Sequence, residues 1–349
     1  MSVKGSTALV RLAGNPTCEI LGAMVMQAGS EKRFFEQVVG EPYDREFGER
    51  QSSKRRGAQF ERNAYAGDAR LLREELSPLI GLDPDDIRVR NLTDDYPGTK
   101  DDARIARLNI TRRILADSIA GRDVPHIIVQ PQLLIPTSPG PRPYFFIAPD
   151  LLVWTGSRQG YIPGDLKSFI VRENEVAKSD LARVRLQLGA QLLALRHEYH
   201  RLDPAIVVAA QGLLIFSRPN GLRPHAPRVE DIGGAVEAIR IGIAAFLRHR
   251  ARIDALRAGA APYTVAADLE PNFQDSCLAS CVMAKWCRER VAGRAADMGD
   301  VAGHVLGDVA MDHVIGLMTG TVAPKDEHER VIAQRLQSLA DQHRVGRVA

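Results

Sequence analysis

The sequence predicts an α/β fold in which a mixed sheet is flanked by helices, with further helical regions at both ends of the chain. Three observations predict it. Apolar runs separated by turn residues occupy the middle of the chain, long stretches of helical periodicity lie before and after them, and the composition is globular. With 349 residues, 45% hydrophobic and 26% charged, the chain can bury the core of one large domain with appendages.

Helices are predicted through most of the first 120 residues. Residues 6–40 have helical periodicity with a break at Asn15-Pro16, so Cys18 is expected at the start of the second helix. Three further elements follow: a helix over 54–82, a short strand over 87–92 and a helix over 101–120.

The predicted sheet is formed by residues 127–217. Ile127 to Ile135 indicates a strand interrupted by Pro131, which is typical of an edge or bulged strand. Tyr144 to Trp154 indicates a buried strand, and Gly160 to Phe169 a strand that returns beside it. The remaining expected elements are a helix over 177–199, the last strand over 206–217 and a long helix over 229–257, with proline-rich spacers at 136–143 and 219–227.

Two acids and a lysine lie on the predicted central hairpin. Asp150 belongs to its first strand, and Asp165 and Lys167 belong to its second. Because side chains alternate along a strand, Asp165 and Lys167 share one face. A carboxylate pair binds a hard divalent cation, and a neighbouring ammonium group orients water or stabilises phosphoryl charge. The pattern therefore predicts metal-assisted hydrolysis of phosphodiesters.

The pattern resembles the PD-(D/E)XK nuclease superfamily and, within it, the RecB-like branch. Gly57 precedes Glu61 by four residues on a predicted helix, as in the Gly-x-x-x-Glu helix of that branch. Gln187 begins a segment similar to its Gln-x-x-x-Tyr helix, although Gln191 stands where tyrosine is usual. The metal-binding histidine that several members have just before the glycine is missing here.

The resemblance implies a restriction-endonuclease-like core and a metal-dependent DNA nuclease, acting as an exonuclease on single strands or DNA ends. It also implies a role for each site residue. Mg²⁺ or Mn²⁺ would be held by Asp150, Asp165, Glu61 and the main-chain carbonyl of Leu166. Lys167 would position the attacking water, and Gln187 would hold the substrate backbone.

The chain has four cysteines: Cys18 near its start, and Cys277, Cys281 and Cys287 near its end. Thiolates bind iron–sulfur clusters or zinc in fours. RecB-like relatives of the AddB and CRISPR-associated group hold a 4Fe-4S cluster with one N-terminal and three C-terminal cysteines, which implies a structural cluster here. The first gap in this chain is one residue longer than the usual Cys-x2-Cys-x5-Cys, so a zinc site or four unrelated buried thiols are the alternatives.

The chain is accordingly divided into four predicted parts: an N-terminal helical segment over 1–50, a nuclease core over 51–260, a cysteine segment over 261–292 and a helical tail over 293–349. The cluster is expected to join the N- and C-terminal helical regions. The tail resembles nothing recognisable.

Charge and motifs limit the partners. The net charge of +3 places any DNA contact on local basic clusters, such as Lys54 to Arg56 and the pair Arg183 and Arg185. No phosphate-binding loop is found, so unwinding would need a helicase or another subunit of a repair or defence complex. Without a signal peptide or a membrane-spanning apolar run, a cytoplasmic protein is expected. Two rival functions remain open, a DNA-binding scaffold subunit with a vestigial site and a zinc-stapled restriction-type endonuclease.

Overall fold

The structure, a computed structural model, divides into two compact units, Met1–Val282 and Met283–Ala349. In the first unit it describes residues 5–27, 31–43, 51–98, 101–136, 144–155, 160–168, 178–218, 221–256, 261–273, 277 and 281–282. In the second it describes 283–290, 313, 316–317, 319–327, 329–330 and 333–334. Most of the predicted helical tail, including 293–312 and 335–349, lies outside the described residues.

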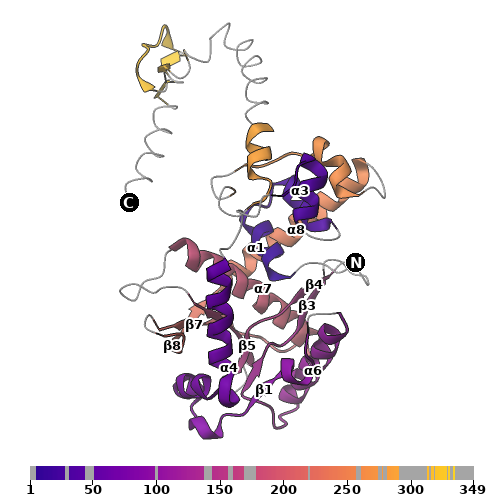
Figure 1. The fold of residues 1–349 in the computed structure, drawn as a ribbon, viewed down its shortest axis with the longest axis vertical. Coiled ribbons are helices and arrows are strands. Elements are labelled where there is room, and N and C mark those ends of the chain that lie inside the picture. The colour runs from indigo at the N-terminus through magenta and orange to yellow at the C-terminus, as the bar shows by residue number, and fades with distance from the viewer. Residues whose placement is uncertain are drawn as a thin grey trace. The chain divides into compact units, whose positions relative to one another are not determined.

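The described part of the first unit contains a six-stranded mixed sheet with helices packed against it (Figure 1). The predicted general architecture is therefore confirmed. The strand order is β1-β2-β5-β6-β7-β8, and the pairs β1/β2 and β6/β7 are parallel while the other neighbours are antiparallel. The strands are β1 (Val89–Asn91), β2 (Ile127–Val129), β5 (Leu151–Trp154), β6 (Tyr161–Lys167), β7 (Gln211–Ser217) and β8 (Pro224–Asp231).

The prediction of single strands over 127–135 and 144–154 is wrong, because the chain changes sheets within each of them. Strands β3 (Leu133–Pro136) and β4 (Tyr144–Ile147) pair with each other in a separate two-stranded sheet. Pro131 and Pro149, which have no N–H to donate to a ladder, lie at the two breaks. The backbone N–H of Gln130 donates to the carbonyl of Asp150 over 2.9 Å and joins the breaks.

Strand β8 is the second correction. Residues 219–227 were expected to be a spacer and 229–257 a helix, yet Pro224–Asp231 pairs antiparallel with β7 and helix α8 is Gly233–Leu256. Pro224 and Pro227 obscure the strand in the sequence. A strand at the edge of a sheet tolerates proline because one of its sides has no ladder to complete.

The predicted helices are largely confirmed. They are α1 (Ser6–Gly14), α2 (Glu19–Met26), α3 (Glu31–Val39), α4 (Gln51–Ile80), α6 (Asp101–Ile119) and α7 (Lys178–Leu202). The short helix α5 (Leu92–Asp95) and the 3₁₀ turns at Pro84–Asp86 and Pro262–Asp268 were not predicted. Cys18 is the N-cap of α2, and its sulfur accepts a hydrogen bond from the N–H of Leu21 at 3.4 Å. Helix α4 is interrupted, because Gly67, Asp68 and Ala69 adopt left-handed φ values between 54° and 57°.

Helices α4 and α7 cover opposite faces of the sheet. Phe60 and Leu72 of α4 belong to one buried apolar cluster with Leu166 of β6 and its sheet neighbours. Asp165, which precedes Leu166 and so points to the other face, contacts Gln187 of α7. The site residues therefore lie where two helices and the end of β6 meet.

Glycines allow close contacts between α7 and α8 and between α8 and α1. A Cβ on Gly189 of α7 would lie 2.7 Å from the carbonyl carbon of Ala235 in α8. A Cβ on Gly242 of α8 would lie 2.8 Å from the backbone nitrogen of Ala13, at the end of α1. A side chain at either glycine would force these helices apart.

Among the described helices, none is long and apolar enough to cross a membrane.

Candidate functional site

The structure brings Asp150, Asp165 and Lys167 together at one end of the β5–β6 pair. Leu151 pairs with Gly164 across the two strands, so Asp150 comes to lie beside the last residues of β6. Its Oδ2 accepts a hydrogen bond of 2.7 Å from the N–H of Leu166. The antiparallel register thus brings together two acids that are fifteen residues apart.

Asp165 is fully buried, and the ammonium group of Lys167 lies beside it. The Nζ of Lys167 lies 2.8 Å from Asp165 Oδ2, as expected for residues on one face of a strand. From α7, Gln187 Nε2 lies 3.4 Å from Asp165 Oδ1. Since a buried carboxylate without a partner is costly, these two contacts stabilise Asp165 in its buried position.

Burial and neighbouring acids raise the pKa of Asp150 and of Glu61. Burial and the charge of Asp165 raise the pKa of Asp150 well above its usual value. Burial also raises the pKa of Glu61; Asp165 adds to the effect and Lys167 opposes it. Burial by itself would lower the pKa of Lys167, but Asp165 and Asp150 outweigh it, so that pKa is raised. Ionisation of all three acids would therefore place more negative charge in the centre than one ammonium group balances.

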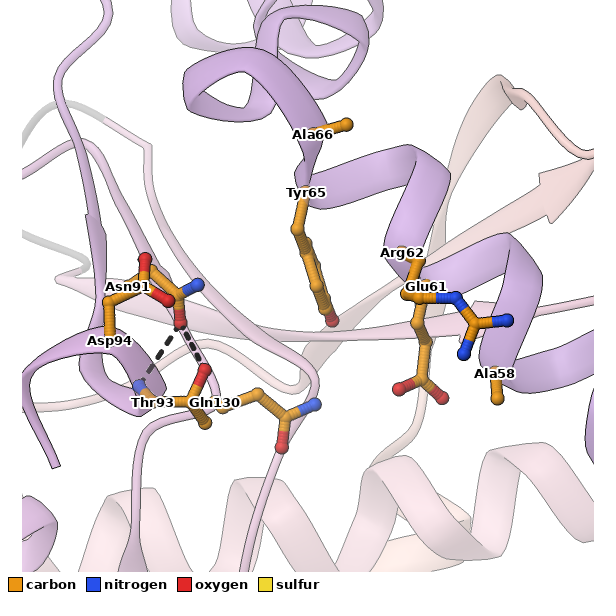
Figure 2. Close-up of a pocket in the computed structure, with 9 residues that line it drawn as sticks. All are labelled: Ala58, Glu61, Arg62, Tyr65, Ala66, Asn91, Thr93, Asp94 and Gln130. Atoms are coloured by element: carbon orange, nitrogen blue, oxygen red, sulfur yellow. Dashed lines mark hydrogen bonds between the residues drawn. The ribbon is translucent and has the colours of Figure 1, made fainter. Parts of the chain in front are cut away.

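Glu61 joins this centre from α4 and also lines a pocket of about 500 Å³ (Figure 2). The pocket lies between α4 and the segment that leads from β1 into α5. Its lining residues are Ala58, Glu61, Arg62, Tyr65, Ala66, Asn91, Thr93, Asp94 and Gln130. Glu61 is the group that the pocket shares with the proposed metal ligands.

Two residues that support Asp150 were not predicted. The N–H of Gln130 and, more weakly, the hydroxyl of Tyr65 donate to the Asp150 carbonyl, at 2.9 and 3.5 Å. Gln130 has a left-handed φ of 52°, which is uncommon for a residue with a side chain and frequent at functional sites. Tyr65 follows Glu61 by one helical turn, a spacing that could have indicated it.

Gln191, in the position where RecB-like proteins usually have tyrosine, is fully buried. Neither its Oε1 nor its Nε2 has a hydrogen-bond partner among the residues that the structure describes. A buried amide without hydrogen bonds destabilises the folded protein. Gln191 is therefore an unusual residue in a helix that is otherwise tightly packed.

The donor set fits a hard divalent cation. Among the described residues, no three His, Cys, Asp or Glu side chains are already arranged as a metal-binding group. Asp150 Oδ2 instead accepts from the N–H of Leu166, and Asp165 pairs with Lys167. Carboxylate oxygens are nevertheless the ligands that Mg²⁺ and Mn²⁺ prefer, and a metal ion would offset both the burial and the repulsion that raise the pKa of Asp150 and Glu61.

Three of the four cysteines, Cys18, Cys277 and Cys281, belong to the first unit, and Cys287 belongs to the second. Burial raises the pKa of the Cys18 thiol, and N–H groups of Asn272, Leu21 and Ile20 oppose this by donating to its sulfur. Such donors are typical around metal-bound thiolates.

Asn15 connects the Cys18 loop with the later cysteines. Its Nδ2 donates to the carbonyl of Asn272 over 2.7 Å and lies 3.8 Å from Cys277 Sγ. Asn272 in turn donates to Asn15 Oδ1 and to the hydroxyl of Thr17. Within the first unit, residues from opposite ends of the sequence therefore meet around Cys18 and Cys277.

The basic residues expected to contact phosphate differ in their surroundings. Arg185 forms an ion pair with Glu230, its Nη2 lying 2.6 Å from Oε2, so part of its charge is already used within the protein. Arg183 is exposed, as is Arg55 on the first turns of α4.

Comparison of the sequence with models of known protein families and with curated proteins finds no match. The function of the site must therefore be argued from its residues and their geometry.

Proposed function

We propose that this chain is a metal-dependent DNA nuclease with a RecB-like PD-(D/E)XK core. The observation that carries the proposal is the convergence of Asp150, Asp165 and Lys167 at the end of β6, with Glu61 interacting electrostatically from α4. Three acids around one ammonium group are the equipment of metal-assisted phosphodiester hydrolysis. Action on single strands or DNA ends is implied by the resemblance.

In this proposal Asp150, Asp165, Glu61 and the carbonyl of Leu166 hold one or two Mg²⁺ or Mn²⁺ ions. A bound cation supplies Lewis-acid polarisation of the phosphate and a more acidic water. Lys167 keeps its proton near neutral pH because its pKa is raised. It therefore acts as a hydrogen-bond donor that orients water and stabilises phosphoryl charge. Gln187 contacts Asp165 and, in this proposal, would also hold the substrate backbone.

A 4Fe-4S cluster held by Cys18, Cys277, Cys281 and Cys287 is the second part of the proposal. The N–H donors around Cys18 and the position of Asn15 beside Cys277 support a metal-bound state of these thiols. They support zinc equally. Anaerobically purified protein should be brown and contain close to four iron atoms per chain; one zinc and no iron would replace the cluster with a zinc staple.

A scaffold subunit with a vestigial site is the second candidate. It is favoured by the Asp165–Lys167 ion pair, because the lysine balances the charge of the buried acid without a metal ion. DNA is the proposed partner in both cases, with a helicase or another subunit of a repair or defence complex. The cytoplasmic location stays a prediction from the sequence.

A nuclease assay separates the two candidates. Single- and double-stranded DNA with free or blocked ends is incubated with Mg²⁺, Mn²⁺ or chelator. Asp165→Asn keeps the shape of the side chain, and we expect it to reduce cleavage by at least about 100-fold, as for loss of an electrostatic catalytic group. The variant used to test the lysine is Lys167→Met. It is chosen over Lys167→Ala because the lysine is largely buried and methionine preserves more of its packing.

The control is Asp86→Asn, which makes the same change at an exposed acid of the 3₁₀ turn. It should cleave like the wild type. Mn²⁺ should also raise the unfolding temperature of the wild type more than that of Asp165→Asn. Cleavage in chelator, or wild-type cleavage by Asp165→Asn, would exclude the proposed centre. DNA binding without cleavage under any condition would favour the scaffold.

A further inference from the structure

The pocket beside Glu61 is large enough to bind part of a substrate and lies next to the proposed cleavage centre. Its volume of about 500 Å³ is within the usual range of small-molecule sites. Figure 2 shows Glu61 and Tyr65 pointing from α4 toward one space, with Asn91 and Thr93 on another side of it and Gln130 nearby. A group in this pocket would be adjacent to anything bound at the carboxylates.

The charges in the pocket disfavour phosphate. Glu61 and Asp94 both line it. The one basic side chain in the lining, Arg62, is hydrogen-bonded to Gln59 of its own helix, Nη2 to Oε1, at 2.7 Å. Asp94, which is not a proposed metal ligand, would repel a phosphate group, whereas the base and sugar of a nucleotide carry no charge. The pocket therefore suits the uncharged part of a nucleotide whose phosphate lies at the metal ligands.

Amide and hydroxyl groups supply the recognition chemistry. Asn91 Oδ1 accepts hydrogen bonds from the N–H and the hydroxyl of Thr93, at 3.1 and 2.8 Å. These two bonds fix the side-chain amide, so its Nδ2 is the end that remains to donate to a ligand (Figure 2). Asparagine and glutamine amides are the side chains that read base edges by paired hydrogen bonds, and Gln130 provides a second amide.

We infer that this pocket binds the base and sugar of one unpaired nucleotide next to the scissile phosphate, and that Asn91 makes cleavage depend on which base is present. The inference rests on the proposed nuclease function and adds a base-selective subsite to it. The base must be unpaired, because pairing would occupy the edge that the amides contact.

The substitution that tests the subsite is Asn91→Asp. Aspartate keeps the oxygen that caps Thr93 and replaces the donating Nδ2 with an acceptor, so the start of α5 is preserved while the recognition pattern is inverted. The double variant Asn91→Asp/Asp94→Asn keeps the net charge of the pocket constant. The matched control is Asn109→Asp, which adds the same charge at an exposed position of α6.

The substrates are otherwise identical single-stranded DNAs with one cleavable linkage, flanked in turn on each side by dA, dC, dG, dT or an abasic site. Cleavage is measured with Mn²⁺, and binding is measured with Ca²⁺ in its place. We expect the wild type to prefer one base, and the abasic substrate to lose at least about tenfold in cleavage and in binding, as for one lost base contact. Asn91→Asp and the double variant should change the preferred base or abolish the preference, and Asn109→Asp should keep it.

The outcomes distinguish this inference from the proposed function. If the wild type cleaves the five substrates of each series equally, or Asn91→Asp keeps the wild-type preference, the subsite is wrong while the nuclease function stands. If the wild type cleaves nothing but binds one base selectively through Asn91, the subsite stands and the nuclease function is wrong. If it neither cleaves nor discriminates in binding, both are wrong.

Discussion

Helices α4 and α7 each bring one polar side chain to the proposed centre, but they are packed in different ways. On α4, a Cβ added to Gly57 would be 3.9 Å from Ser168 Oγ, an ordinary contact, and a pocket lies beside the helix. On α7, a Cβ added to Gly189 would be 2.7 Å from the Ala235 carbonyl carbon. Gly57 of the α4 motif is therefore not required by packing, whereas Gly189 of α7 is.

The comparison suggests a division of roles. Helix α7 is wedged between the sheet and α8 and holds Gln187 against Asp165. Helix α4 is interrupted after Tyr65 and leaves space next to Glu61. A rigid side that fixes the acids and an open side that admits substrate is the arrangement that catalysis needs. A change at Glu61 of α4 should alter function more than stability, and a change at Gly189 of α7 the reverse.

The largest expected effect is that of Glu61→Gln on α4. We expect cleavage at limiting Mg²⁺ to fall by about 100-fold, because a proposed metal ligand loses its charge, and raised Mn²⁺ to restore part of it. Without metal, the variant should unfold at the same denaturant concentration as the wild type or a higher one, since burial and Asp165 disfavour the charged form of Glu61. Glu74→Gln, an exposed position on the same helix, is the control. Unfolding of Glu61→Gln would make the residue structural.

Gly189→Ala tests the other helix. The added methyl group meets the backbone of α8, so we expect a loss of about 1–3 kcal/mol in the free energy of unfolding, measured by denaturant titration. Cleavage by the protein that remains folded should stay close to that of the wild type. Wild-type stability in this variant would mean that α7 and α8 can separate easily, and the comparison of the helices would not hold.

Glu61 of α4 should also affect how the stability of the protein changes with pH. Because the pKa of Glu61 is raised in the folded protein, the folded state binds its proton more tightly than the unfolded chain does. Between the unfolded pKa, about 4.3, and the higher folded one, the metal-free protein gains stability from Glu61 as the pH falls. Unfolding in chelator at a series of pH values should show a smaller gain for Glu61→Gln than for the wild type. An equal gain would mean that Glu61 is not affected by its buried surroundings.

Gly57→Ala should have the smallest effect. The position is helical and has space for a methyl group, so we expect a change between zero and a gain of about 1 kcal/mol, from the better helix propensity of alanine. Cleavage should be unchanged. If the variant is stable but cleaves poorly, the DNA backbone must approach α4 closely at Gly57, which would place substrate on this helix directly.

Much of the fold follows from short-range patterns. Helical periodicity predicts α4, α6 and α7 nearly to their ends, because a helix is specified by contacts three and four residues apart. Strand alternation predicts that Asp165 and Lys167 lie together, and their 2.8 Å ion pair agrees with it. The hairpin prediction brings Asp150 to β6 because an antiparallel register is set by local pairing.

Long-range contacts account for what the patterns miss. Whether residues 144–154 form one strand or two depends on which sheet each part joins. Strand β8 is defined by its pairing with β7, a contact that the local sequence does not reveal. The support that Gln130 and Tyr65 give to Asp150 depends in the same way on segments that are distant in sequence.

The sequence by itself determined the chemical set of the candidate centre and its place on a strand, because residue type and alternation are local properties. Only the tertiary structure decided that Gly189 is required by packing while Gly57 is not, and that a pocket with a fixed amide lies beside Glu61. Contact between helices and the space left between them depend on how whole elements pack, and the sequence specifies that packing only through the complete fold.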